Sequence, residues 1–237
     1  MSEINVFLKD GTYTSFSGVQ FTDNYLKKTA QIYYGAKSCG FQSVTSKDVQ
    51  KYMNSKHGYQ ESDIRTLISL LKKMGFINEF NNNTNGENLF TIEGELFVHI
   101  VNIKMNMDNT SPSFKSKINN AFSLLLQKGL IYAHANKVSL DIPNNFWLLI
   151  DLFKKLGTLS GKEYLYAISL CEQITIDEIV ARIINNRGNN VEYNIYKYPD
   201  NNPIANTAYS YNMGLLEQAN IITNLGNSYY KLINNVL

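Results

Sequence analysis

The 237-residue chain contains few cysteines, few prolines and no long apolar run. Its two cysteines, Cys39 and Cys171, form no CxxC motif and belong to no His/Cys group with metal-ligand spacing. The longest apolar stretch, at 146–150, is too short to cross a bilayer, and the charged first ten residues lack the apolar core of a secretory signal. We therefore expect a cytoplasmic protein with reduced thiols, no metal and no membrane segment.

The chain also lacks a large excess of either positive or negative charge. The chain carries 22 Lys and Arg against 20 Asp and Glu, so its net charge of +2 does not by itself predict a polyanionic partner. The distribution is uneven, because residues 101–158 carry seven basic and three acidic side chains. A basic centre thus lies between a neutral N-terminal part and a weakly acidic C-terminal part.

Motifs that would indicate catalysis are missing. The sequence has no Asp/Glu-x-Lys triplet of the kind that holds Mg²⁺ in common nucleases, no HExxH, no GxxxxGK[ST] and no GxGxxG. The three histidines are scattered along the chain. We expect neither an enzyme nor a bound cofactor.

What the chain does contain is an eleven-residue pattern that occurs three times. Each copy has paired leucines, then Gly75, Gly129 or Asn220, and finally an isoleucine. Glycine, and after it asparagine, best tolerates the left-handed conformation that often ends a helix. Each copy is therefore predicted to end a helix and to begin a short strand. The copies span residues 67–77, 121–131 and 212–222.

A second signal precedes the first and last copies. Thr45 with Asp48, and Thr175 with Glu178, have the spacing of a capping box, and each is flanked by apolar residues placed as a hydrophobic staple. The box lies 25 residues before the leucines in the first case and 40 in the last. A Gly/Asn/Pro-rich insertion at 185–203 accounts for the difference.

The remaining elements follow from periodicity and turn residues. We expect a hairpin at 6–21 that turns at Asp10-Gly11, a helix at 24–34, and a ribbon at 76–94 with a polar Asn-rich loop at 81–88. The middle segment predicts helices at 97–107 and 114–128, then a ribbon that turns near Asn136-Lys137. Two more helices are expected at 145–156 and 162–171.

Three helices, the second opened by a capped Thr and the third ending in LLxxxGxI, followed by a ribbon, resemble the winged helix-turn-helix superfamily. The resemblance is carried by 45–53, 64–77 and 91–94, and again by 175–183, 211–222 and 229–232. It implies a mainly α fold with short β-ribbons (α+β), in which tandem winged-helix units are joined by a helical or hairpin middle segment. The expected units are 1–98, 99–143 and 144–237; whether the middle one is a degenerate winged helix is left open.

The superfamily commonly places the exposed side of its third helix in a DNA major groove, while the wing contacts the backbone. Small polar, amide and cationic side chains on that side can read bases or bind phosphates. The residues expected on the inward sides are Phe114, Ile118, Ala121 and Leu125 in the middle segment, and Ala208, Tyr211 and Leu215 in the last unit. The candidate DNA-binding residues are Arg65, Thr66, Ser69, Lys115, Lys117, Asn119, Asn120, Arg187, Lys197, Thr207, Ser210 and Asn212.

Two functions of different classes are compatible with these patterns. The first is a double-stranded DNA-binding protein: a regulator, a replication initiator, or the recognition component of a restriction or defence system. The second is a protein-interaction scaffold built from tandem winged helices, with a protein partner or a homodimer in place of DNA. The basic centre and the exposed cationic and amide side chains favour DNA, whereas the small net charge and the acidic last unit favour a scaffold.

Overall fold

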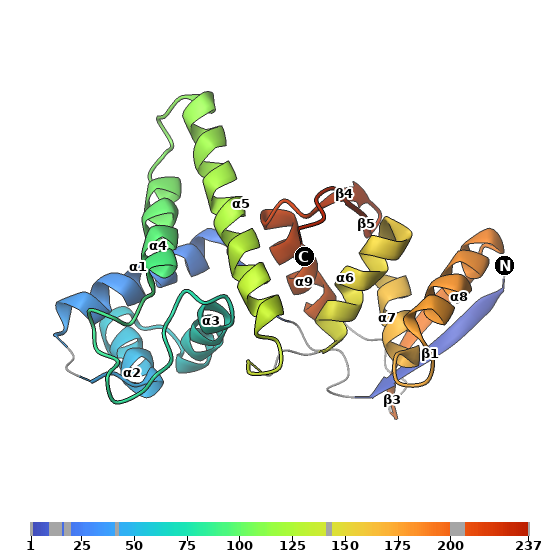
Figure 1. Ribbon diagram of the computed structural model, residues 1–237, viewed down its shortest axis with the longest axis horizontal. Coiled ribbons are helices and arrows are strands. Elements are labelled where there is room, and N and C mark those ends of the chain that lie inside the picture. Colours follow the sequence, from blue (N-terminus) through green and yellow to red (C-terminus); the bar gives the residue numbers. More distant parts are fainter. Residues whose placement is uncertain are drawn as a thin grey trace. The chain divides into compact units, whose positions relative to one another are not determined.

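The computed structural model describes residues 2–9, 16, 20–40, 43–140, 144–199 and 207–236, without the side chains of 144, 207 and 208. In this part of the chain the fold is mainly helical, with nine helices and five short strands, which confirms the expected α+β class. The chain forms two compact units (Figure 1). We call Ser17–Ile142 the central unit, and Met1–Phe16 with Pro143–Leu237 the terminal unit.

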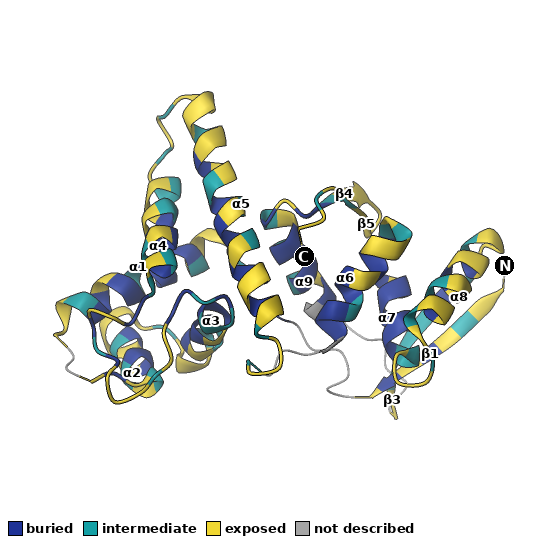
Figure 2. Cartoon of the chain, in the orientation of Figure 1, coloured by how far each residue is buried: buried dark blue, intermediate teal, exposed yellow. Residues whose placement is uncertain are grey.

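The central unit is built from helices around a phenylalanine core. Phe76 and Phe97 stack with ring centroids 4.5 Å apart, and Phe97 lies 5.6 Å from Phe122. Dark, buried faces of the helices meet at this core while their yellow faces lie outside (Figure 2). The helices are α1 (Asp23–Ser38), α2 (Ser46–His57), α3 (Glu61–Lys73), α4 (Ile92–Met105) and α5 (Pro112–Ala135).

The ribbon expected after α3 is reduced to one antiparallel bridge between Ile77 and Phe90. The prediction of a strand through 91–94 was wrong, because Thr91 is the N-cap of α4 and its side chain accepts a hydrogen bond from the Gly94 amide at 3.0 Å. A Cβ at Gly94 would lie 1.9 Å from the carbonyl oxygen of Phe76. This glycine therefore lets the start of α4 pack directly on the backbone that follows α3.

The three copies of the repeated pattern have two different roles. Gly75 (φ 71°) and Asn220 (φ 54°) are left-handed and follow the ends of their helices, as predicted. Gly129 lies inside α5, which continues to Ala135 and is followed by turns through Leu140, so the ribbon expected after Gly129 was wrong for the described residues. At this position a Cβ would lie 2.7 Å from Met74 Cε. The middle glycine thus permits close helix packing instead of ending a helix.

The terminal unit combines helices with two small sheets. Strand β1 (Glu3–Lys9) pairs in parallel with β3 (Glu192–Tyr198), while the antiparallel sheet has the order β2-β5-β4. Its core includes Phe16, whose ring stacks on Phe146 with centroids 4.5 Å apart. The other elements are α6 (Asn144–Leu156), β2 (Thr158–Ser160), α7 (Gly161–Leu170), α8 (Ile176–Gly188), α9 (Thr207–Gln218), β4 (Ile222–Gly226) and β5 (Tyr229–Leu232).

Helix starts in both units match the capping signals. Thr45 with Asp48 before α2, and Thr175 with Glu178 before α8, form complete capping boxes, as the sequence predicts. Ser160 with Glu163 forms a third box before α7 that the sequence patterns did not identify. In each box the cap hydroxyl accepts from a backbone amide, and the acidic side chain accepts from the cap amide.

The unit boundaries differ from the sequence-based division. The boundary at 98/99 falls inside α4, and residues 99–142 belong with the first three helices because α4 and α5 complete their core. Strand β1 pairs with β3; the turn and most of the second strand of the predicted hairpin, at 10–15 and 17–19, lie outside the described residues. Within the insertion, 185–188 end α8 and 192–198 form β3, while 200–203 are not described. No helix in the described segments combines the length and apolarity needed to cross a membrane.

Candidate nucleic-acid interface

Helices α2 and α3 form a compact pair joined by three residues, Gly58, Tyr59 and Gln60. Gly58 has a φ of 69°, a left-handed conformation that suits glycine and turns the chain between the helices. Met53 on α2 and Ile64 on α3 are fully buried. The inner faces of the two helices are thus fixed by packing, and their outer faces are available for other contacts.

The outer surface of this pair is basic. Residues 46–73 carry six Lys and Arg against three Asp and Glu. Lys47 and Lys51 lie four residues apart on α2, Lys56 lies in its last turn, and Arg65 lies on α3; all four are exposed. The sequence patterns did not indicate the three α2 lysines, because the candidate residues came from the expected third helices and from the insertion. The four-residue spacing of Lys47 and Lys51 places both on one side of the helix, opposite Val49, an apolar residue that follows the Thr45 capping box. This pattern in the sequence could have identified them.

Two of the three carboxylates near this surface are already engaged. Asp48 accepts hydrogen bonds from the side chain and amide of Thr45, and these bonds lower its pKa. Asp63 lies 3.0 Å from the Nζ of Lys28, which is buried. Only Glu61, among the described side chains of α2 and α3, remains as an exposed carboxylate. Among the exposed charged side chains of α2 and α3, Lys47, Lys51, Lys56 and Arg65 therefore outnumber the single carboxylate, Glu61.

The predicted α3 residues lie on this surface. Arg65 and Ser69 are exposed, as expected from the positions of the buried leucines and isoleucines. Thr66 is half-buried, and its hydroxyl donates a hydrogen bond to the Ser62 carbonyl at 2.9 Å. Arg65 and Ser69 therefore present free side-chain ends more directly than Thr66 does.

The Asn-rich loop between α3 and α4 is held by its own side chains. Asn81 and Asn85 accept hydrogen bonds from backbone amides two residues further on. Thr84 is buried, and its carbonyl accepts from the Val44 amide at 2.9 Å. The loop is thus anchored to the start of α2. This anchoring explains the asparagines by local turn chemistry, without requiring a DNA-contacting wing.

The candidate residues of α5 lie apart from α3. Lys115 is half-buried and donates to the Asp108 carbonyl at 2.8 Å, and Asn119 accepts from Lys104. Lys117 and Asn120 are exposed. A rise of about 1.5 Å per residue places Lys117 about 18 Å along α5 from Gly129, where the helix meets Met74. The α5 and α3 candidates do not form one continuous site.

Two related expectations for α5 need correction. Phe114, expected on the inward side, is 41% exposed, and Ala121 is only half-buried. Ile118 and Leu125 are buried, as expected, and the packed face of α5 also includes Phe122 and Leu126. The helix was expected to end at Gly129 and to feed a ribbon, but it continues to Ala135 and packs against α4, and Phe114 in its first turn lies outside the packed face.

In the terminal unit, Asn212 is not a candidate for base contact. Its side chain is completely buried, and its Oδ1 accepts a hydrogen bond from the Phe16 amide at 2.8 Å. The predicted outward position was wrong because a segment 196 residues earlier in the chain covers this side of α9. Tyr211, expected to be inward, is half-buried.

Arg187 also has a structural role, and its side chain is not available for the DNA contact that was expected of it. Its Nε and Nη2 atoms lie 2.7 and 3.0 Å from the carboxylate of Glu163, and Nη2 also donates to the Thr158 carbonyl at 2.8 Å. Hydrogen bonding to Glu163 raises the pKa of Arg187. Because Glu163 is 2% exposed, the pair ties the end of α8 to the start of α7.

The remaining candidates in the terminal unit provide no basic surface. Lys197 is half-buried in β3 and Ser210 is exposed on α9; Thr207 begins α9, but its side chain lies outside the described residues. The sequence of α9 contains no Lys or Arg. The terminal unit carries eight basic and ten acidic residues, and the central unit carries fourteen and ten. Positive charge therefore concentrates in the central unit.

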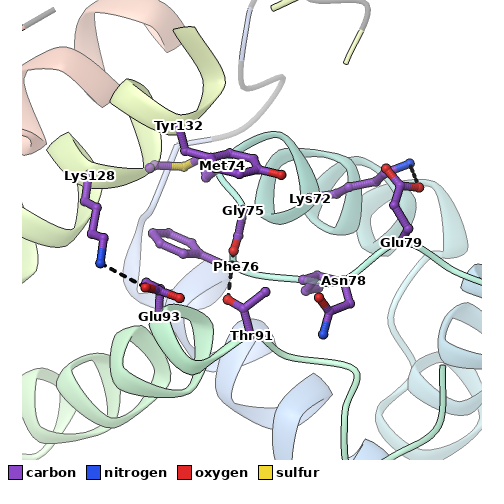
Figure 3. A pocket seen from close by; sticks show the side chains of 12 residues that line it. Lys72, Met74, Gly75, Phe76, Asn78, Glu79, Thr91, Glu93, Lys128 and Tyr132 are labelled. Carbon is purple, nitrogen blue, oxygen red and sulfur yellow. Dashed lines mark hydrogen bonds and ion pairs between the residues drawn. The ribbon is translucent and has the colours of Figure 1, made fainter. Parts of the chain in front are cut away.

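A cavity of about 360 Å³ lies beside the C-terminal end of α3 (Figure 3). Met74, Phe76 and Tyr132 provide its apolar walls, and the Thr91 hydroxyl donates to the Gly75 carbonyl at 2.8 Å. Two ion pairs lie at its rim: Lys72–Glu79 at 2.6 Å and Lys128–Glu93 at 2.9 Å. The contact with Lys128 is the main cause that lowers the pKa of Glu93.

In the described part of the chain, no three His, Cys, Asp or Glu side chains come together in a group that fits a metal ion. Comparison with protein-family models, with curated proteins and with solved structures finds no match to this chain. The geometry of α2 and α3 and the distribution of charge are therefore the observations on which a functional proposal rests.

Proposed function

We propose that the protein binds double-stranded DNA through the α2–α3 pair of the central unit, acting as the helix-turn-helix of a winged-helix domain. One observation carries this proposal: Lys47, Lys51 and Arg65 lie exposed on two helices joined by a three-residue turn with a left-handed glycine. Such a pair places its second helix in the major groove while the first crosses the backbone.

The two helices then have different tasks. Lys47 and Lys51 bind phosphates through flexible, fully charged side chains, which supplies affinity that depends on salt but not on sequence. Arg65 and Ser69 face the base edges, and the arginine fork suits the two acceptors of guanine. The proposal is therefore sequence-specific binding, as in a regulator, a replication initiator or the recognition component of a restriction or defence system.

The topology of the terminal unit favours a second winged helix in the same chain. Its antiparallel sheet has the order β2-β5-β4, and β4 and β5 follow α9 directly. The absence of Lys and Arg from α9, and the burial of Asn212, argue against a second DNA-reading helix there. We assign DNA contact to the central unit alone.

A second candidate function, a protein-interaction scaffold, is favoured by apolar side chains on α4 and α5. Ile92 is 84% exposed and Leu124 is 63% exposed, and Leu96 and Ile131 are also exposed. Exposed apolar side chains in number mark protein-binding surfaces more often than DNA-binding ones. Under this alternative the basic α2–α3 surface would have no specific role.

Selection from a randomised duplex library with the full chain, repeated in a salt series, separates the two candidates. DNA binding predicts enrichment of related sequences, and affinity that falls steeply as salt rises. Arg65→Ala is expected to change which sequences are enriched, whereas Lys51→Gln should weaken binding to all sequences alike. A library that stays random, with binding insensitive to salt, contradicts the proposal and leaves the scaffold.

A further inference from the structure

The bridge between Ile77 and Phe90 leaves one edge of the backbone without a partner. The Asn78 amide donates to Leu89, and the Thr91 amide donates to Phe76, so Ile77 and Phe90 are a non-hydrogen-bonded antiparallel pair. In such a pair the N–H and C=O groups of Ile77 point away from the opposite segment. Within the described residues neither group has a hydrogen-bond partner, although Ile77 is only 3% exposed.

A backbone donor and acceptor that are both buried and unpaired are rare, because each loses its water without gaining a new bond. Two residues further along the chain, the Glu79 carbonyl accepts from the Thr84 hydroxyl at 2.6 Å, while the Glu79 amide has no partner among the described groups. Ile77 and Glu79 both line the cavity beside α3. The unpaired backbone groups therefore belong to residues that line the cavity.

The other walls of the cavity show which chemistry it accepts. Tyr132 of α5 lies beside Met74, with Phe76 further along the cavity, and together they form an apolar slot (Figure 3). Lys72 and Lys128, the two cations of the cavity, are each paired with a glutamate. Phosphate or another anion would have to displace these carboxylates, so a neutral group that both donates and accepts hydrogen bonds fits better.

We propose that this cavity is a binding site for an extended peptide segment of a protein partner, which pairs with the backbone at 77–79. A peptide strand supplies alternating C=O and N–H groups on one side, and these match the Ile77 N–H, the Ile77 C=O and the Glu79 N–H. An apolar side chain of the peptide occupies the slot between Tyr132 and Phe76. This binding mode is independent of the DNA-binding proposal.

The test is selection of nine-residue peptides from a random display library on the full chain, followed by affinity measurement with one synthetic peptide that is enriched. We expect an apolar consensus residue flanked by extended sequence. Tyr132→Ala should weaken binding by about tenfold or more, because it removes a wall of the slot. The matched control is Phe114→Ala, an exposed aromatic residue on α5 that does not line the cavity, and it should leave affinity unchanged.

Backbone pairing has its own signature. Amide hydrogen exchange at Ile77 and Glu79 should be fast in the free protein and slow by about tenfold or more with the peptide bound. N-methylation of the peptide amides that face the edge should abolish binding, while N-methylation of the alternate amides should be tolerated. No enriched peptide, equal effects of the two variants, or unchanged exchange at both amides overturns the proposal. DNA binding, measured separately with Arg65→Ala, can fail or succeed without affecting these results.

Discussion

Removing the two outward lysines of α2 is expected to reduce both the affinity for DNA and its dependence on salt. The perturbation is the double variant Lys47→Gln/Lys51→Gln. Both side chains are exposed, and neither forms a salt bridge among the described residues, so their loss removes no internal ion pair. Glutamine has a helix propensity close to that of lysine, and α2 should therefore remain folded.

The magnitude follows from counterion release. Each phosphate contact contributes about 0.9 to the slope of log affinity against log salt, so two contacts contribute about 1.8. Between about 50 and 200 mM salt, a fourfold change, the wild type should lose about tenfold more affinity than the double variant. The assay is fluorescence anisotropy with a labelled duplex of a selected sequence, measured at five or more salt concentrations.

The control is a double variant that removes two positive charges from the terminal unit. Lys154 on α6 and Lys231 on β5 are exposed, and Lys154→Gln/Lys231→Gln should leave the slope unchanged. Equal slopes for the wild type and the α2 variant would refute the assignment of phosphate contacts to α2. Equal reductions by both pairs of substitutions would show that only the net charge of the chain matters.

Four further substitutions test the roles that the structure gives to individual side chains. Arg187→Ala should destabilise the terminal unit by about 3 kcal/mol in denaturant unfolding, because it leaves the buried Glu163 carboxylate without its cationic partner. The same substitution should leave DNA affinity unchanged. A loss of affinity without a loss of stability would restore Arg187 as a DNA contact. Gly94→Ala should cost about 3 kcal/mol, since its Cβ would overlap the Phe76 carbonyl, and a neutral effect on thermal unfolding would contradict this close approach. Asp48→Asn should cost about 1 kcal/mol or less at neutral pH. Because the pKa of Asp48 is lowered in the folded state, its stabilisation is present above the ordinary aspartate pKa of about 4 and is lost as pH falls further, so the two proteins should converge in acid. Lys117→Gln should weaken DNA binding less than Lys51→Gln, and the reverse order would move the interface to α5.

Features that depend on neighbours in sequence could be predicted. The capping boxes at Thr45 and Thr175 and the left-handed residues Gly75 and Asn220 are set by local backbone chemistry, and the structure confirms each of them. The outward positions of Arg65 and Ser69 followed from helical periodicity in the same way. The candidate surface on α3 was therefore accessible from the sequence.

Features that depend on distant segments were predicted wrongly. Glycine is common at helix ends and in turns, but Gly129 and Gly94 are each required because another segment packs closely against them. Asn212 has the periodicity of an exposed position, but Phe16, far away in sequence, covers it. Arg187 resembles a loop cation, and only the fold reveals its buried partner Glu163. Sequence patterns do not distinguish an exposed polar residue from one that is covered by a remote element.

The central claim, that α3 of the central unit contacts duplex DNA and α9 of the terminal unit does not, can be tested by site-specific cross-linking. A photo-reactive phenylalanine analogue is introduced at Ser69 on α3 or at Ser210 on α9, both of which are exposed. Each protein is irradiated with the selected duplex, and the covalent complex is quantified. The account predicts cross-linked DNA with the probe at position 69 and none above background at 210. Cross-linking at 210 alone, or at neither position, would contradict it.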